Sequence, residues 1–184
     1  MPTGRGGLKT LSVYLDVYSQ HVWVFPFKTA GSSKTTVQSL GHIFRGFLPP
    51  ETFMSDGGSH FNSAEVCSFC SKWGTNTHVT SAYSPWVNGL VEGMNKLLLH
   101  ILKRICAPEL GEDQEDASWD ELPNTWPLHL DDAILTLNRR LLPNLKFSPK
   151  ELLFGITVGT PTTPVENATS VLRTEDMLTQ LAYS

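Results

Sequence analysis

The order of strands and helices between residues 51 and 106 limits the possible fold more than any other feature of the sequence. A short apolar run, Thr52-Phe53-Met54, predicts a strand over residues 51–55 that ends in a Gly-Gly turn. Apolar side chains at helical spacing predict helices over residues 62–73 and 88–106, and residues 77–80 predict a short strand between them. Alternating strands and helices are typical of an α/β sheet.

Two carboxylates occupy special places in this stretch. Asp56 directly follows the first strand, and Glu92 lies about one turn into the long helix, with 35 residues between them. A carboxylate at a strand end and another near a helix start can share a divalent cation, because Mg²⁺ prefers hard oxygen ligands. Asp56 and Glu92 are therefore the first candidates for catalytic and metal-binding residues.

The residues around both carboxylates form recognisable motifs. Residues 55–61 read Ser-Asp-Gly-Gly-Ser-His-Phe, and residues 83–96 read Tyr-Ser-Pro-Trp-Val-Asn-Gly-Leu-Val-Glu-Gly-Met-Asn-Lys. At this spacing they resemble the second and third members of the D…D-x35-E triad of retroviral and retrotransposon integrases. Residues 13–19 and 147–155 resemble flanking segments of gypsy-type integrase catalytic cores. The resemblance covers roughly residues 1–155, a domain of ordinary size.

The residues before this stretch predict a hairpin and a helix. Residues 22–27 predict a strand that pairs with a preceding one, and a Gly-Ser-Ser cap introduces a helix over residues 34–46. The preceding strand, at residues 8–17, alternates and places four side chains on one face: Leu11, Val13, Leu15 and Val17. A hairpin followed by this α/β order is the pattern of a ribonuclease H-like integrase core, a mixed sheet flanked by helices.

We expect one catalytic-core-like domain over residues 1–156 and a C-terminal tail over 157–184, because 184 residues suffice for one proper core. An acidic linker at 107–118 lies inside this domain. A last long helix is expected over about 124–140, and its apolar residues are Leu128, Ala133, Ile134 and Leu137.

The charge distribution permits a nucleic-acid partner without demanding one. The chain carries a net charge of −4, but residues 109–121 hold seven acids and no Lys or Arg. The rest of the chain has 11 acids against 14 bases, so it is weakly basic. No apolar run is long enough to cross a bilayer, and the first residues lack the apolar stretch of a signal peptide. We expect an intracellular protein, nuclear if functional, with no membrane partner.

The long helix has an apolar face and a charged face. The apolar side chains are Val91, Met94, Leu98, Ile101, Leu102 and Ile105. The charged or polar ones lie at i, i+4, i+8 and i+12: Glu92, Lys96, His100 and Arg104. This stripe has two interpretations. It is a solvated face with a favourable Glu–Lys pair, or it is a surface along which a DNA backbone binds. The surrounding motif favours the DNA-binding interpretation. With the resemblance, the predicted DNA-binding residues are Asn88, Asn95, Lys96, Lys103 and Arg104.

The resemblance implies an in-line attack of a hydroxyl on a phosphodiester, assisted by two Mg²⁺ or Mn²⁺ ions. Asp56 would hold one ion and Glu92 the other, while a third carboxylate bridges both. In the family that carboxylate ends the first, central strand, whereas residues 1–10 contain no Asp or Glu. The resemblance therefore implies that the chain begins just after the first catalytic Asp, lacks the first central strand, and needs a third carboxylate before it can use the metal.

Asp16 and the cysteine pair have simpler interpretations than catalysis or metal binding. Asp16 falls on the alternate face of its strand, just before the turn, and is not a metal ligand in the family. Cys67 and Cys70 form a C-x-x-C without a second Cys or His pair at zinc-finger spacing. Their helix is predicted to bury Val66, Phe69, Cys70 and Trp73.

Three functions remain open from the sequence. The first is an integrase-like polynucleotidyl transferase domain of a long-terminal-repeat retroelement, acting in DNA integration and catalytically incomplete as this chain. The second is a non-catalytic module that binds DNA or RNA, and the third is a protein-interaction domain that forms a homodimer through helix faces. Metal dependence separates the first from the others, and salt-sensitive DNA binding separates the second from the third.

Overall fold

The structure, a computed structural model, describes residues 1–80, 85–106 and 118–156, with the side chains of residues 85–88 left undescribed. The chain divides into two compact units. The first contains Met1–Leu15 and Val22–Leu137, and the second contains Asp16–His21 and the residues from Asn138 onward. Residues 107–117 of the predicted linker at 107–118, and the predicted tail at 157–184, lie outside the described residues.

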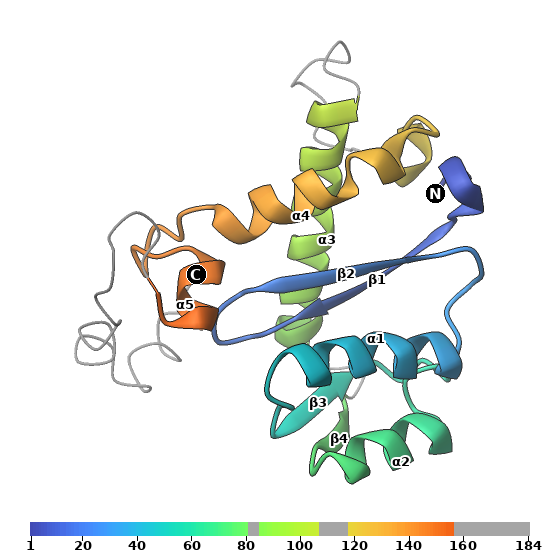
Figure 1. The fold of residues 1–184 in the computed structure, drawn as a ribbon, viewed down its shortest axis with the longest axis vertical. Helices are drawn as coiled ribbons and strands as arrows, with labels where there is room; N and C mark the ends of the chain where they lie inside the picture. Colours follow the sequence, from blue (N-terminus) through green and yellow to red (C-terminus); the bar gives the residue numbers. More distant parts are fainter. Residues whose placement is uncertain (81–84, 107–117, 157–184) are drawn as a thin grey trace. The chain divides into compact units, whose positions relative to one another are not determined.

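The predicted strands and helices are present in the predicted order (Figure 1). The elements are β1 (Thr10–Leu15), β2 (Val22–Phe27), α1 (Ser33–Gly46), β3 (Thr52–Ser55), α2 (Ala64–Lys72), β4 (Asn76–Val79), α3 (Pro85–Cys106), α4 (Leu130–Arg139) and α5 (Pro149–Phe154). Short 3₁₀ turns occur at Arg5–Gly7, Trp119–Glu121 and Trp126–Leu128. The predicted α/β class is confirmed.

The last long helix begins later than predicted. Residues 124–129 form turns and a 3₁₀ helix, and α4 starts at Leu130. Pro123 and Pro127 explain the difference, because proline lacks the N–H that a helix interior requires. Leu128, which was predicted to belong to this helix, lies outside α4 and is 57% exposed.

Strand pairing produces two small sheets in the first unit. β1 and β2 are antiparallel, from Thr10↔Phe27 to Leu15↔Val22, whereas β3 and β4 are parallel, from Thr52↔Asn76 to Ser55↔Val79. Among the described strands, no hydrogen-bonded ladder joins one pair to the other. The residues before β1 add no strand, because Gly6 and Gly7 adopt positive φ angles of 76° and 79° in a 3₁₀ turn.

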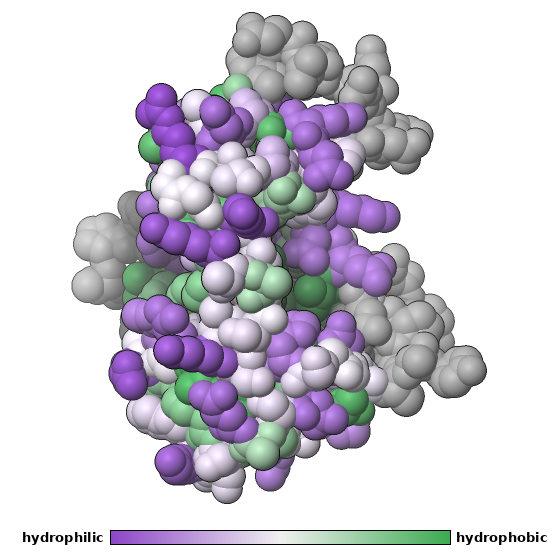
Figure 2. All heavy atoms as spheres, turned by 90° about the vertical axis from the view of Figure 1, so that its right-hand side faces the viewer, coloured by the Kyte–Doolittle hydropathy of each residue, from purple (hydrophilic) through white to green (hydrophobic). Residues whose placement is uncertain are grey.

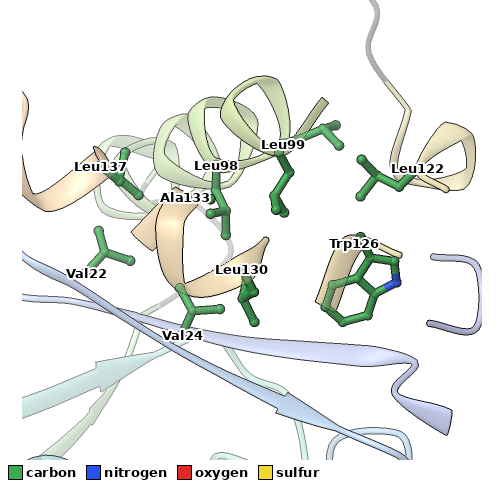
Figure 3. Close-up of a cluster of buried hydrophobic side chains, with 10 residues drawn as sticks. Val22, Val24, Leu98, Leu99, Leu122, Trp126, Leu130, Ala133 and Leu137 are labelled. Carbon is green, nitrogen blue, oxygen red and sulfur yellow. The ribbon is translucent and has the colours of Figure 1, made fainter. Parts of the chain in front are cut away.

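The β1–β2 hairpin is covered by apolar side chains on both faces. One face packs against α3, α4 and the turns before α4 (Figure 3). The buried members of this cluster are Val22, Val24, Leu98, Leu99, Leu102, Leu122, Trp126, Leu130, Ala133 and Leu137. Leu11, Val13 and Leu15 pack against it as predicted. Val17 does not: it follows β1 and is 43% exposed.

The other face of the hairpin packs on α1, which lies between the hairpin and α2 (Figure 1). The buried members of this second cluster are Tyr14, Leu40, Ile43, Phe44, Val66 and Cys70. The Tyr14 ring lies 6.0 Å from the Phe25 ring and 6.4 Å from the Phe53 ring, measured between centroids. Burial raises the pKa of the Tyr14 hydroxyl. β3 is thereby anchored to the same helical layer as β1.

Serine caps fix the helix starts that the sequence predicted. The Ser32 hydroxyl accepts a hydrogen bond from the Thr35 N–H at 3.3 Å, and the Thr35 hydroxyl accepts one from the Ser32 N–H at 2.9 Å. Ser63 caps α2 in the same way, accepting from the Val66 N–H at 3.3 Å. Each cap satisfies a backbone donor that the helix leaves unpaired.

The C-x-x-C segment lies on α2. Cys70 is fully buried, as predicted, and burial raises the pKa of its thiol to about 11. Cys67 is half-buried and its sulfur lies 3.8 Å from the Thr77 hydroxyl. Trp73 is 38% exposed, so its predicted burial is wrong. It follows the last residue of the helix, and its ring only partly covers Phe69, at 6.4 Å between centroids.

In the second unit, Asp16 stabilises the turn between β1 and β2. Its Oδ2 accepts hydrogen bonds from the Ser19 N–H at 2.8 Å and from the Ser19 hydroxyl at 2.6 Å. Such side-chain bonds to nearby backbone are typical of turns. The structural interpretation of Asp16 is therefore confirmed. His21 is 8% exposed and meets the Phe154 ring edge-on, with 6.4 Å between centroids.

Candidate functional site

Asp56 occupies a turn at the carboxyl end of the parallel strand pair. The Ser55 carbonyl, at the end of β3, accepts hydrogen bonds from the Thr80 N–H at 2.8 Å and the Thr80 hydroxyl at 3.0 Å. The exposed Asp56 follows, and its Oδ1 accepts a hydrogen bond from the Gly58 N–H at 3.1 Å. One carboxylate oxygen thus shapes the turn, and Oδ2 remains available for an external ligand.

His60 is a neighbour of this carboxylate that the sequence analysis did not single out. A Cβ atom at Gly58 would lie 2.9 Å from Asp56 Oδ1 and 3.0 Å from His60 Cε1. The centroids of the His60 and Phe61 rings are 4.0 Å apart. A Cβ atom at Gly31 would lie 3.3 Å from the His60 ring. His60 therefore links the Asp56 turn to the loop before α1. Its place four residues after Asp56 in the motif was the available signal.

Glu92 lies on the exposed face of α3, as predicted. Lys96, His100 and Arg104 share that exposure. The opposite face of the helix carries Leu98, Leu99 and Leu102 of the first apolar cluster, of which only Leu99 was not predicted. The two-faced character of the helix is confirmed. If the two carboxylates share a metal ion or a metal pair, as their motifs predict, they should approach each other to within roughly 8 Å.

Lys103 departs from the predicted basic stripe. Its side chain is 13% exposed and forms an ion pair with Glu121, so the prediction that Lys103 is exposed to solvent is wrong. The hydrogen bond from Lys103 lowers the pKa of the Glu121 carboxyl. Lys103 precedes Arg104 by one residue, so its side chain leaves the helix in a different direction. It reaches the 3₁₀ turn that follows the acidic linker. Asn95 is half-buried, and the side chain of Asn88 lies outside the described residues.

The described residues bring together no group of three or more His, Cys, Asp or Glu side chains that could hold a metal ion. Asp56 and Glu92 carry hard oxygen ligands of the type that Mg²⁺ prefers, and their role as metal ligands stays a prediction.

Similarity to known proteins agrees with this architecture. Residues 1–85 match the integrase core domain family, a range that includes Asp56 and ends before Glu92. The chain is 29% identical over 161 residues to the Pro-Pol polyprotein of simian foamy virus type 3, strain LK3, a match over 88% of this chain. It is 28% identical over 152 residues to the Gag-Pol polyprotein of gibbon ape leukemia virus, a match over 83% of this chain.

Two solved structures share the fold. One is the simian T-cell lymphotropic virus intasome in complex with PP2A regulatory subunit B56 gamma, at a TM-score of 0.65, 21% identity and 88% coverage of this chain. The other is the HTLV-2 integrase catalytic core domain in complex with magnesium, in a trimeric form, at a TM-score of 0.60, 20% identity and 78% coverage. The fold is that of a retroviral-type integrase catalytic core.

The chain is much shorter than several of the proteins it resembles. It spans 13% of the foamy virus polyprotein, 8% of the leukemia virus polyprotein and 54% of the intasome chain, although it covers 83% of the magnesium-bound core. Nothing about the activity or partners of a whole polyprotein follows from this overlap. No helix among the described residues is long and apolar enough to cross a membrane.

Proposed function

We propose that this chain is an integrase-like polynucleotidyl transferase domain of a long-terminal-repeat retroelement, with DNA as its substrate. The observation that supports the proposal most is the position of Asp56. Its exposed carboxylate lies on a tight turn at the carboxyl end of β3, in an integrase-core fold, with Oδ2 directed at no described donor. Carboxyl ends of parallel strands are where open α/β sheets bind their ligands.

The reaction that fits this site is an in-line attack at phosphorus. A hydroxyl oxygen, from water or a DNA 3′ end, forms a new bond to phosphorus while the bond to the leaving oxygen breaks. A Mg²⁺ or Mn²⁺ pair supplies activation of the nucleophile and stabilisation of the leaving oxygen when it is bound. Asp56 and Glu92 provide two of the carboxylates that such a pair needs. We therefore propose that the chain by itself is catalytically incomplete.

DNA contacts are proposed for the exposed side of α3. Lys96 and Arg104 are exposed on the side that carries Glu92, and long basic side chains on a helix suit the phosphate backbone. Asn95 is proposed as a hydrogen-bond donor. Lys103 contributes only after release from Glu121, because an ammonium group held by a carboxylate offers less charge to a phosphate.

A strand-transfer assay tests the enzymatic half of the proposal. The 184-residue chain should bind duplex DNA in a salt-dependent manner and should not join DNA ends with Mg²⁺ or Mn²⁺. A form extended by in-frame upstream codons that include an Asp should gain joining activity. In that extended form, Asp56→Asn and Glu92→Gln should each abolish joining while leaving DNA binding in place.

The outcome that contradicts incompleteness is Mg²⁺-dependent joining by the 184-residue chain alone. Such activity would mean that another carboxylate takes the place of the third one. Asp16→Asn would then show whether Asp16 is that carboxylate.

Replacing the duplex with single-stranded RNA in the binding assay tests RNA as a partner. Sedimentation analysis tests a homodimer. A chain that binds no nucleic acid would favour the protein-interaction function instead.

A further inference from the structure

The first 50 residues of the chain have a strong excess of positive charge. They contain a single carboxylate, Asp16, which the hairpin turn engages with two hydrogen bonds. Against it stand five basic residues: Arg5, Lys9, Lys28, Lys34 and Arg45. All five side chains are exposed. These five residues are separate from the basic stripe of α3, and none of them is among the DNA contacts proposed above.

Lys9 and Lys28 both lie at the open end of the β1–β2 hairpin. The Lys9 N–H donates to the Phe27 carbonyl at 2.8 Å, and Lys28 directly follows Phe27. Among the described residues, the ion pairs join the N-terminus to Asp120 and Lys103 to Glu121, and neither Lys9 nor Lys28 takes part in one. Both exposed ammonium groups therefore lack a carboxylate partner within the described chain.

Lys34 adds a third positive charge at the other end of the same loop. It is exposed in the first turn of α1, a turn that contains no acidic residue. A cation is unfavourable there, because the N-terminal end of a helix carries partial positive charge. The exposed lysines Lys9, Lys28 and Lys34 are called the basic loop cluster below.

The loop between these lysines reaches the Asp56 turn. Gly31, three residues after Lys28, lies against the His60 ring. A Cβ atom at Gly31 would lie 3.3 Å from His60 Cδ2. The His60 ring and the Asp56 carboxylate both lie next to Gly58, within 3.0 Å of the position that a Cβ atom would take there. The connection from the end of β2 to the start of α1 lies on the side of the first unit that faces the viewer in Figure 2, where hydrophilic side chains are spread over the surface.

From this arrangement we propose that the basic loop cluster is a second contact for the backbone of duplex DNA, on the Asp56 side of the site. The inference rests on the proposed function and names a surface that α3 does not provide. Exposed, hydrated ammonium groups gain little from one small anion at physiological salt. A polyanion is different, because each phosphate that a lysine neutralises releases condensed counterions. Exposed lysines without carboxylate partners thus favour a nucleic-acid backbone.

The test is a salt titration of binding to a labelled random-sequence duplex, followed by fluorescence anisotropy. The variant is Lys9→Ala/Lys28→Ala, and the control is Lys72→Ala/Lys146→Ala, which removes two exposed lysines elsewhere and so matches the net charge. The variant should bind about 10- to 100-fold more weakly near 0.1 M salt, with its salt slope reduced by about 2. Lys9→Arg/Lys28→Arg should keep the slope of the original chain.

Thermal unfolding at low salt separates a binding effect from a folding effect. Because both lysines are exposed and neither takes part in an ion pair among the described residues, Lys9→Ala/Lys28→Ala should leave the melting temperature nearly unchanged. An unchanged salt slope in this variant, or an equal loss in the control, would overturn the inference while the proposed function stands. If the original chain shows no salt-dependent duplex binding at all, the proposed function fails together with it.

Discussion

Burial of His21 predicts that the protein loses stability in mild acid. The side chain is 8% exposed, and its ring meets Phe154 edge-on. Burial lowers the pKa of His21 from 6.5 to about 4, an effect that nearby Asp16 opposes and Lys150 reinforces. The neutral imidazole is therefore the form that the folded protein favours.

The sign and size of the effect follow from proton linkage. Between pH 6.5 and about 4, the unfolded chain binds a proton at His21 that the folded chain does not. The free energy of unfolding is therefore complete above pH 6.5 and falls as the pH drops through this window. Each unit of pKa shift corresponds to about 1.4 kcal/mol, so a shift from 6.5 to about 4 corresponds to a loss of at most about 3.5 kcal/mol below pH 4.

Urea denaturation at several pH values between 7.5 and 4 measures this loss. The matched variant is His21→Phe, which removes the titrating group, keeps an aromatic ring against Phe154 and retains the backbone N–H that donates to the Ser19 hydroxyl at 3.2 Å. The difference in unfolding free energy between the two proteins should change across the window. Parallel pH profiles, or a His21 pKa near 6.5 by NMR titration, would refute the reasoning.

Two glycine substitutions test the packing and the site. Gly4→Ala should lower the unfolding free energy by about 1–3 kcal/mol in urea denaturation, because its Cβ would lie 2.7 Å from Trp126 Nε1. Gly58→Ala should displace the Asp56 carboxylate, 2.9 Å from the new Cβ, and reduce Mg²⁺-induced NMR shifts in that turn. Gly57→Ala is the matched control, since its Cβ would meet nothing within 4 Å, and equal effects of both variants would contradict the prediction.

The parts of the fold that the sequence predicted are those decided by local chemistry. The cap at Ser32, the Gly-Gly turn after Asp56 and the two faces of α3 depend on neighbouring residues or on helical spacing. Even α4 was predicted in type, and only its start was misplaced, because the effect of two prolines on residues 124–129 was underestimated.

Tertiary partners could not be predicted in the same way. Lys103 pairs with Glu121, which lies 18 residues later and beyond the acidic linker, and nothing in the helical spacing of α3 indicates that partner. The exposure of Trp73 depends on where α2 ends. The approach of both His60 and Asp56 to Gly58 depends on how tightly the chain turns there, and periodicity does not encode it.

The strand edges connect this fold to its proposed catalytic incompleteness. Among the described strands, β1 pairs only with β2 and β3 only with β4, yet the rings of Tyr14 and Phe53 lie 6.4 Å apart. Apolar packing on α1 thus holds the two sheets on one layer without a backbone ladder between them. Asp56 directly follows β3, so among the described strands no backbone ladder fixes its distance from the hairpin. Hydrogen bonds fix strand positions far more narrowly than packing does. We therefore expect a strand that bonds to the free edges of both β1 and β3 to do more than supply a third carboxylate: it would also fix the position of Asp56.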